Sequence, residues 1–208
     1  MILGQSGTGK SASLRNLPPS DALLIQSVRK PLPFKSAGWK LCTKADPSGS
    51  ILVTDSHATI VTAMKRTQRK IIVIDDFQYV MCNEFMQRSD ERGYDKFTEI
   101  ARHAWDVLMC ATHLDDDKRV YILSHTQQDE NGVKAKTIGK MLDEKITVEG
   151  LVSIVLRTKI VNSDFLFRTR NDGSDTTKTP MGMFDDELIP NDLALVDRKI
   201  CEFYEIAT

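Results

Sequence analysis

The chain has few of the features that mark a secreted, metal-stapled or membrane-spanning protein. Its 4 cysteines are scattered without a Cys-x-x-Cys pair, which excludes a disulfide framework or a cysteine zinc site as the organising feature. No apolar run approaches the roughly 18 residues that a membrane-spanning helix needs. No secretory signal pattern precedes the first motif. We therefore expect a cytoplasmic protein with reduced thiols and no membrane association.

An excess of charge of one sign is also missing. The chain carries 28 Lys and Arg against 29 Asp and Glu, a formal net charge of −1. Without a global basic field, any nucleic-acid binding has to come from a local patch or from an assembled ring. Hydrophobic residues make up 41% of the 208 positions, which is ordinary for a globular protein. We expect one domain over residues 1–208.

What the sequence does contain is a phosphate-binding pattern close to its start. The stretch 4–11, GQSGTGKS, fits G-x-x-x-x-G-K-[ST], the loop of P-loop NTPases. Glycines let successive backbone N–H groups point at phosphate oxygens. Lys10 is expected to reach the β- and γ-phosphates and Ser11 to bind Mg²⁺, while a helix starting near Gly9 turns its positive end to the anion. A plain glycine-rich turn is the alternative. The expected nucleotide contacts are Gly4, Gln5, Ser6, Gly7, Thr8, Gly9, Lys10, Ser11 and Ala12.

Apolar runs along the rest of the chain predict alternating strands and helices. Strands are predicted at 22–26, 51–54, 71–74, 120–123, 151–158 and 165–169, and helices at 10–17, 58–69, 97–111, 138–145 and 192–206. This alternation indicates an α/β three-layer sandwich with a mainly parallel central sheet, and the late strand pair and last helix, about 151–208, belong to the same domain. Only Met1-Ile2-Leu3 precede the loop, so either the first strand is short or the native chain starts earlier.

Two carboxylates, Asp75 and Asp76, follow the β-branched run at 71–74. Such a run predicts a strand buried on both faces, and four apolar residues followed by Asp is a Walker B pattern. Asp75 is predicted to hold Mg²⁺ opposite Ser11, because a buried Asp beside another is costly without a cation. The alternative is that the strand-end Asp caps the next helix.

Three side chains are candidates for the steps that follow nucleotide binding. Asp76 is predicted to orient the attacking water. Glu84 is a backup for that role, although we favour a solvent-facing helix position for it. His125 ends a predicted strand where a side chain can sense the γ-phosphate; a structural role is the alternative. The other histidines show no metal-ligand spacing with one another or with cysteine: His57, His103 and His113.

A basic group lies late in the chain: Arg157, Lys159, Arg168, Arg170 and Lys178. Arg170 and Lys178 flank a polar stretch that can reach a neighbouring subunit, where a cation stabilises the transition-state charge on the γ-phosphate. Ordinary surface charge is the alternative. For DNA, the candidates are the polar loops 127–136 and 30–44; Trp39 in the second is either a base-stacking platform or a partly buried loop residue.

These motifs together resemble those of RecA-type or AAA-type P-loop ATPases. The narrower resemblance is to the small single-domain ATPases of bacteriophages, some of which are RecA-like, act in recombination and bind single-stranded DNA. It rests on residues 74–81, 83–86, 179–184 and 191–193. The resemblance implies a RecA-like core, ATP and Mg²⁺ as cofactors, a homo-oligomeric ring or filament, single-stranded DNA as a partner, and the host cytoplasm as location.

The chain departs from this resemblance at Gln26. In RecA-type proteins the strand after the P-loop helix often ends in the catalytic Glu, and Gln cannot act as a base. The role therefore passes to Asp76, or hydrolysis is slow. This leaves an alternative from another class, a nucleotide-switched DNA- or protein-binding module with negligible turnover. A small-molecule kinase is a third reading, but no compact Arg-rich lid stands out.

Overall fold

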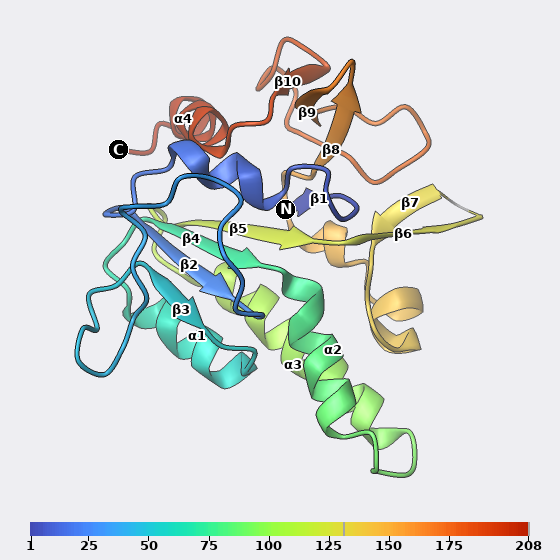
Figure 1. Cartoon of the computed structure of the whole chain (residues 1–208). Helices are drawn as coiled ribbons and strands as arrows, with labels where there is room; N and C mark the ends of the chain where they lie inside the picture. The colour runs from blue at the N-terminus through green and yellow to red at the C-terminus, as the bar shows by residue number, and fades with distance from the viewer. Residues whose placement is uncertain (131, 208) are drawn as a thin grey trace.

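An eight-stranded sheet forms the middle layer of the computed structural model, which describes residues 1–130 and 132–207 (Figure 1). In spatial order the strands are β10 (Leu188–Pro190), β9 (Asp164–Arg168), β8 (Leu156–Val161), β1 (Ile2–Leu3), β5 (Arg119–Ser124), β4 (Ile71–Asp75), β2 (Ala22–Gln26) and β3 (Ile51–Val53). Every neighbouring pair from β8 to β3 is parallel, whereas β9 and β10 add antiparallel strands at one edge. The predicted mainly parallel sheet is confirmed.

Helices cover both faces of this sheet, as Figure 1 shows. One face carries α1 (His57–Arg66), α2 (Phe77–Gln87) and α3 (Asp95–Ala111), and the other carries η1 (Ser11–Asn16) and α4 (Leu193–Tyr204). A separate two-stranded sheet, β6 (Thr126–Asp129) with β7 (Gly132–Ala135), and two short helices, η2 (Met141–Lys145) and η3 (Val148–Leu151), complete the elements. The arrangement is the predicted α/β sandwich of three layers.

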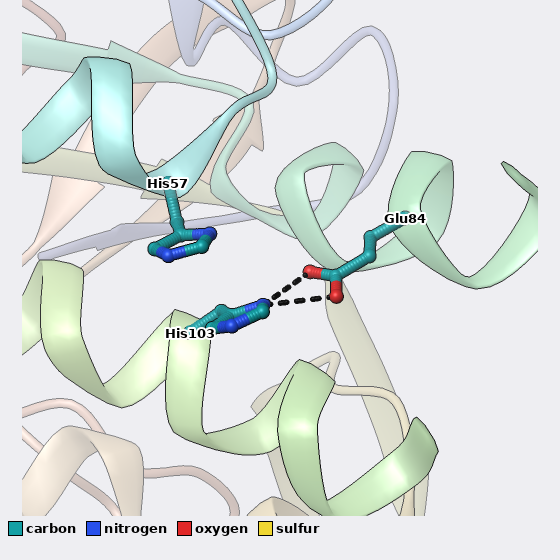
Figure 2. Close-up of side chains that lie close together, drawn as sticks. All are labelled: His57, Glu84 and His103. Carbon is teal, nitrogen blue, oxygen red and sulfur yellow. Dashed lines mark hydrogen bonds and ion pairs between the residues drawn. The ribbon is translucent and has the colours of Figure 1, made fainter. Parts of the chain in front are cut away.

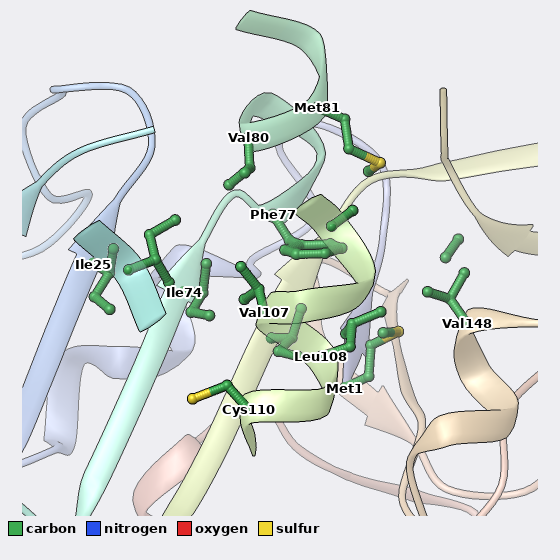
Figure 3. Close-up of a cluster of buried hydrophobic side chains, with 14 of the residues drawn as sticks. Met1, Ile25, Ile74, Phe77, Val80, Met81, Val107, Leu108, Cys110 and Val148 are labelled. Carbon is green, nitrogen blue, oxygen red and sulfur yellow. The ribbon is translucent and has the colours of Figure 1, made fainter. Parts of the chain in front are cut away.

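Each face of the sheet has its own hydrophobic core, because β4 is buried at every position. Figure 3 shows one core, in which Ile74 of the sheet packs with Phe77 and Leu108 from the helices of the first face. The alternate side chains Ile71 and Val73 belong to the second core, beneath η1 and α4. Full burial of a side chain of this size contributes about 1.5–3 kcal/mol. The two cores thereby fix the strand that carries the paired carboxylates.

Several elements differ from the prediction in start or type. The helix expected at 10–17 is a 3₁₀-helix, η1, and the one expected at 138–145 is a short π-helix, η2. The strand expected from 151 begins only at Leu156, because its parallel partner β1 begins at Ile2, which pairs with Leu156. The polar loop expected at 127–136 contains the strands β6 and β7. Apolar periodicity does not record where pairing with a distant strand starts.

A buried ionic network ties α4 to the sheet. Asp197 of α4 accepts hydrogen bonds from Arg119 Nε at 2.8 Å, Arg119 Nη2 at 2.9 Å and the Tyr121 hydroxyl at 2.6 Å. Burial, reinforced by Asp197, raises the pKa of Tyr121, so the hydroxyl keeps its proton and acts as a donor. With both oxygens of Asp197 occupied, the network fixes α4 over β5.

Candidate functional site

The loop 4–11 leaves the carboxyl end of β1, between β5 and β8. Its base is held from both sides, because Gly4 N donates to Ser124 O at 3.2 Å and the Thr8 and Thr158 hydroxyls are 2.6 Å apart. A Cβ atom on Gly4 would collide with the Thr158 hydroxyl. Glycine at this position therefore lets the loop sit directly against β8.

Gly9 is needed for two independent reasons. Its φ of +97° is disfavoured for other residues, and an added Cβ would lie 2.9 Å from Phe165 Cδ1 of β9. The following helix η1 begins at Ser11 and is of the 3₁₀ type, so the expected helix starting near Gly9 is wrong in type and in start. The curled backbone of the loop, rather than the end of an α-helix, therefore forms this part of the site.

A cavity of about 640 Å³ lies against the loop, within the usual size range of ligand pockets. Predicted loop residues that line it are Ser6, Gly7, Gly9, Lys10, Ser11 and Ala12. Gly4, Gln5 and Thr8 lie outside this lining, with Gly4 buried beneath the loop. Asp76 and His125 line the cavity as well. The structure therefore brings most of the predicted loop contacts and two predicted catalytic residues to one cavity.

Ser11 and Asp75 join the two motifs directly. Ser11 Oγ donates to Asp75 Oδ2 at 2.8 Å. The side chain of Asp75 is fully buried, and its Oδ1 has no hydrogen-bond partner among the described residues. Burial and the neighbouring Asp76 raise the pKa of Asp75. A hydroxyl beside a buried carboxylate with a spare oxygen is an all-oxygen donor set, which suits Mg²⁺.

Lys10 is folded over its own loop. Its Nζ donates to Gly4 O at 2.9 Å and to Gln5 O at 3.0 Å. Burial lowers the pKa of Lys10, and the two carboxylates at 75 and 76 oppose that shift. The ammonium therefore lies at the loop, near the acidic pair, in a position to donate hydrogen bonds to an anion bound there.

Asp76 is held by two side chains through one oxygen. Its Oδ2 lies 3.3 Å from Lys30 Nζ and 3.2 Å from His125 Nε2, and its buried Oδ1 has no partner among the described residues. Burial and nearby Lys10 lower the pKa of His125, so its ring is neutral at pH 7 and can donate from Nε2 to the carboxylate. The carboxylate is thus oriented through Oδ2, while Oδ1 is buried.

Sequence reasoning missed Lys30 and two aromatic residues of the lining, Tyr79 and Phe165. Lys30 follows the carboxyl end of β2, and ligands in parallel α/β sheets bind at that edge, so its position after the strand could have indicated it. Phe165 comes from β9, and nothing in the sequence pattern shows that this hairpin lies beside the loop.

Arg170 and Lys178 lie away from the cavity of their own chain. Arg170 Nη2 donates to Phe184 O at 3.1 Å and to Asp185 O at 2.7 Å. Lys178 is exposed, and its backbone pairs with Val155. Their action on a neighbouring subunit remains a prediction.

Gln26 and Glu84 also lie outside the cavity lining. The buried Gln26 pairs with Asp75 in the sheet register, and its Nε2 donates to Lys30 O at 3.1 Å. Glu84 is half-buried and accepts from Arg88 Nη1 at 3.0 Å, so the favoured solvent-facing position for it is wrong. Glu84 lies in α2, outside the cavity lining, so it does not support the backup role considered for it.

No protein-family model matches the chain, and no curated protein matches it either. Among the described residues, none of the helices combines the length and apolar character needed to cross a membrane. The geometry of the cavity and the sequence motifs therefore carry the argument for function.

Proposed function

We propose that the chain is a Mg²⁺-dependent ATP-binding and hydrolysing P-loop ATPase with a RecA-like core. The hydrogen bond from Ser11 to Asp75, 2.8 Å long beside a glycine loop, carries this proposal. It disfavours the alternative that Asp75 caps the next helix, because the residue at the cap position of α2 is Asp76, whose side chain makes no capping bond. Two buried carboxylates with spare oxygens are costly unless a cation compensates them.

The loop and its neighbours divide the binding of Mg·ATP among them. Ser11 and Asp75 would hold Mg²⁺, whose charge neutralises the β- and γ-phosphate oxygens when it is bound. The backbone N–H groups of the loop bind phosphate oxygens. Lys10 exchanges its present acceptors, the carbonyls of Gly4 and Gln5, for a phosphate. Exchange of neutral acceptors for an anion strengthens each of its hydrogen bonds.

Asp76 orients the water that attacks the γ-phosphate. It lines the cavity, and its spare Oδ1 can accept a hydrogen bond from that water. Lys30 and His125 both hold Oδ2, so they fix the direction of the carboxylate. His125 therefore acts on the cavity by orienting Asp76, and its own ring is neutral at pH 7.

The aromatic lining suits a nucleotide better than a bare phosphate. Phe165, with 47% of its surface exposed, lies at the cavity beside Gly9, and Tyr79 lies edge-on to His125 with ring centroids 6.0 Å apart. An exposed aromatic face beside a phosphate loop offers a stacking partner for a base.

The proposed setting is DNA recombination or replication in phage, on single-stranded DNA, by a homo-oligomeric ring or filament in the host cytoplasm. It rests on the sequence resemblance alone. Trp39 gives it no support as a stacking platform, because it is half-buried and packs edge-on against Phe34 with centroids 6.4 Å apart. Any contact with single-stranded DNA has to use other residues.

A nucleotide-switched binding module with negligible turnover is the second candidate. Gln26 favours it, since the position that supplies the catalytic Glu in the resembling proteins holds an amide packed against Lys30 O. The engagement of Asp76 by Lys30 also favours it, because Lys30 Nζ, 3.3 Å from Oδ2, occupies an oxygen that could otherwise bind water.

A titration of fluorescent ATP with and without Mg²⁺ tests the binding step. Ser11→Ala is expected to weaken Mg·ATP binding at least about tenfold, because one metal ligand is lost. The exposed Ser20 offers a matched control, and Ser20→Ala should bind as the wild type does. Equal binding in EDTA, or none in either condition, contradicts the proposal. Phosphate release with and without single-stranded DNA then separates the ATPase from the switched module.

A further inference from the structure

Three side chains from three different helices converge on the face of the sheet that carries α1, α2 and α3 (Figure 2). His57 opens α1, Glu84 lies in α2 and His103 lies in α3. One ligand atom from each of these half-buried residues can be chosen so that all lie within 4.8 Å of one another. The sequence spacing of His57 and His103 gave no sign of this convergence, which arises from the packing of three helices.

The imidazole nitrogens and the carboxylate oxygens are the donor atoms that metal ions of intermediate softness, such as Zn²⁺, bind. His103 Nδ1 lies 2.9 Å from Glu84 Oε1 and 3.0 Å from Oε2. The His57 ring stacks on the His103 ring, with centroids 3.6 Å apart and planes at 10°. Two imidazoles and one carboxylate are the three protein ligands of many zinc sites that leave a fourth position for water. Mg²⁺ selects oxygen ligands and is disfavoured here.

We propose that His57, Glu84 and His103 form a Zn²⁺ site. The site is separate from the nucleotide cavity and does not depend on the proposed ATPase function. It is a new assignment for these residues, made from their convergence and donor chemistry alone.

Binding requires one ring to turn. A zinc ion lies about 2.0–2.1 Å from a histidine nitrogen and close to the plane of its ring, and two nearly parallel planes 3.6 Å apart cannot both contain it. His57 is the ring with room to turn, because it stands at the first residue of α1 and is half-exposed, whereas His103 is held by Glu84. Rotation of His57 brings its lone pair toward the space beside His103 and Glu84.

Arg88 stands behind the carboxylate. Its Nη1 donates to Glu84 Oε1 at 3.0 Å, and its Nη2 is paired with Glu91 and Glu99 at 2.7 Å each. An outer partner of this kind orients a ligating carboxylate. A bound ion would clamp α1, α2 and α3 together, and α2 follows directly from Asp75 and Asp76.

Zn²⁺ titration against a chelating dye, in the presence of excess Mg²⁺, tests the site. One equivalent of Zn²⁺ is expected to bind, to raise the melting temperature, and, with Co²⁺ as substitute, to give the visible absorption of a tetrahedral centre. His57→Ala and His103→Ala are each expected to weaken binding about 100-fold or more. His113→Ala is the matched control, since His113 is exposed at the end of α3 and should leave binding intact.

Two outcomes overturn the proposal. The first is that Zn²⁺ does not bind stoichiometrically. The second is that His57→Ala leaves Zn²⁺ binding unchanged. Should Asp75→Asn abolish binding while His57→Ala does not, the ion lies in the nucleotide cavity. His57→Ala keeps the test decisive even if His103→Ala fails to fold, because the half-exposed His57 lies at a helix end. Circular dichroism of each variant establishes that it is folded before titration.

Discussion

Replacing Asp76 with Asn separates nucleotide binding from hydrolysis. Asn keeps the shape of the side chain, loses its charge, and still places an oxygen toward His125, 3.2 Å from Oδ2 in the present structure. Loss of a group that orients or deprotonates the attacking water costs about 10²–10⁴-fold in turnover. That loss corresponds to about 3–5 kcal/mol in the activation free energy.

Binding of Mg·ATP should change far less. Asp75 and Ser11 are untouched by this substitution, and the broken pair with Lys30 joins a side chain that is 39% exposed. Asp76 is expected to contact the attacking water and neither Mg²⁺ nor a phosphate, so affinity is expected to shift by no more than about fivefold. Asp75→Asn is the matched comparison, and it is expected to lose the Mg²⁺-dependent part of binding because it removes a metal ligand.

Single-turnover phosphate release and fluorescent-ATP titration measure the two effects on the same preparations. Robust turnover that is unchanged in Asp76→Asn refutes the water-orienting role. If Asp76→Asn loses Mg·ATP binding and turnover to the same extent, Asp76 contributes to nucleotide binding instead. Negligible turnover in the wild type, with tight Mg·ATP binding, favours the nucleotide-switched module.

Two predictions concern stability. Asp197→Ala leaves the buried Arg119 charge unpaired, so the free energy of unfolding in urea should fall by about 3–5 kcal/mol; a loss under about 1 kcal/mol would show that the network contributes little. For the 208-residue chain with a free Met1 amine, burial lowers the pKa of that amine from 8.0 to about 5. Between these values the unfolded chain binds a proton that the folded chain does not, so stability should rise with pH from 5 to 8 by up to about 1.4 kcal/mol per pH unit. Acetylation of the amine should remove this slope in urea titrations, and an unchanged slope contradicts the assignment.

The loop and its acidic partner could be predicted because their positions follow from local rules. Glycine spacing marks the loop, and an apolar run ending in carboxylates marks the strand that ends beside it. Since parallel strands present their carboxyl ends at one edge, Ser11, Asp75 and His125 could be placed together without coordinates. Their order in the sheet was not needed for that inference.

Residues contributed by packing between distant elements could not be found in this way. Phe165 reaches the cavity because β9 pairs with β8, which itself pairs with β1. His57, Glu84 and His103 meet because α1 and α2 both pack on α3. Local periodicity indicates that a helix has a buried face, but not which other helix supplies its neighbour.

The interior place of β1 in the sheet has a consequence for how the protein is made. Ile2 pairs with Leu123 on one side and with Leu156 on the other, so β1 can pair only after these later parts of the chain have been made. The groups that support the loop 4–11, Ser124 O and the Thr158 hydroxyl, belong to those partner segments. Such long-range pairings form slowly compared with local contacts. The loop 4–11 therefore acquires its supported shape only after the residues of β8 have been translated.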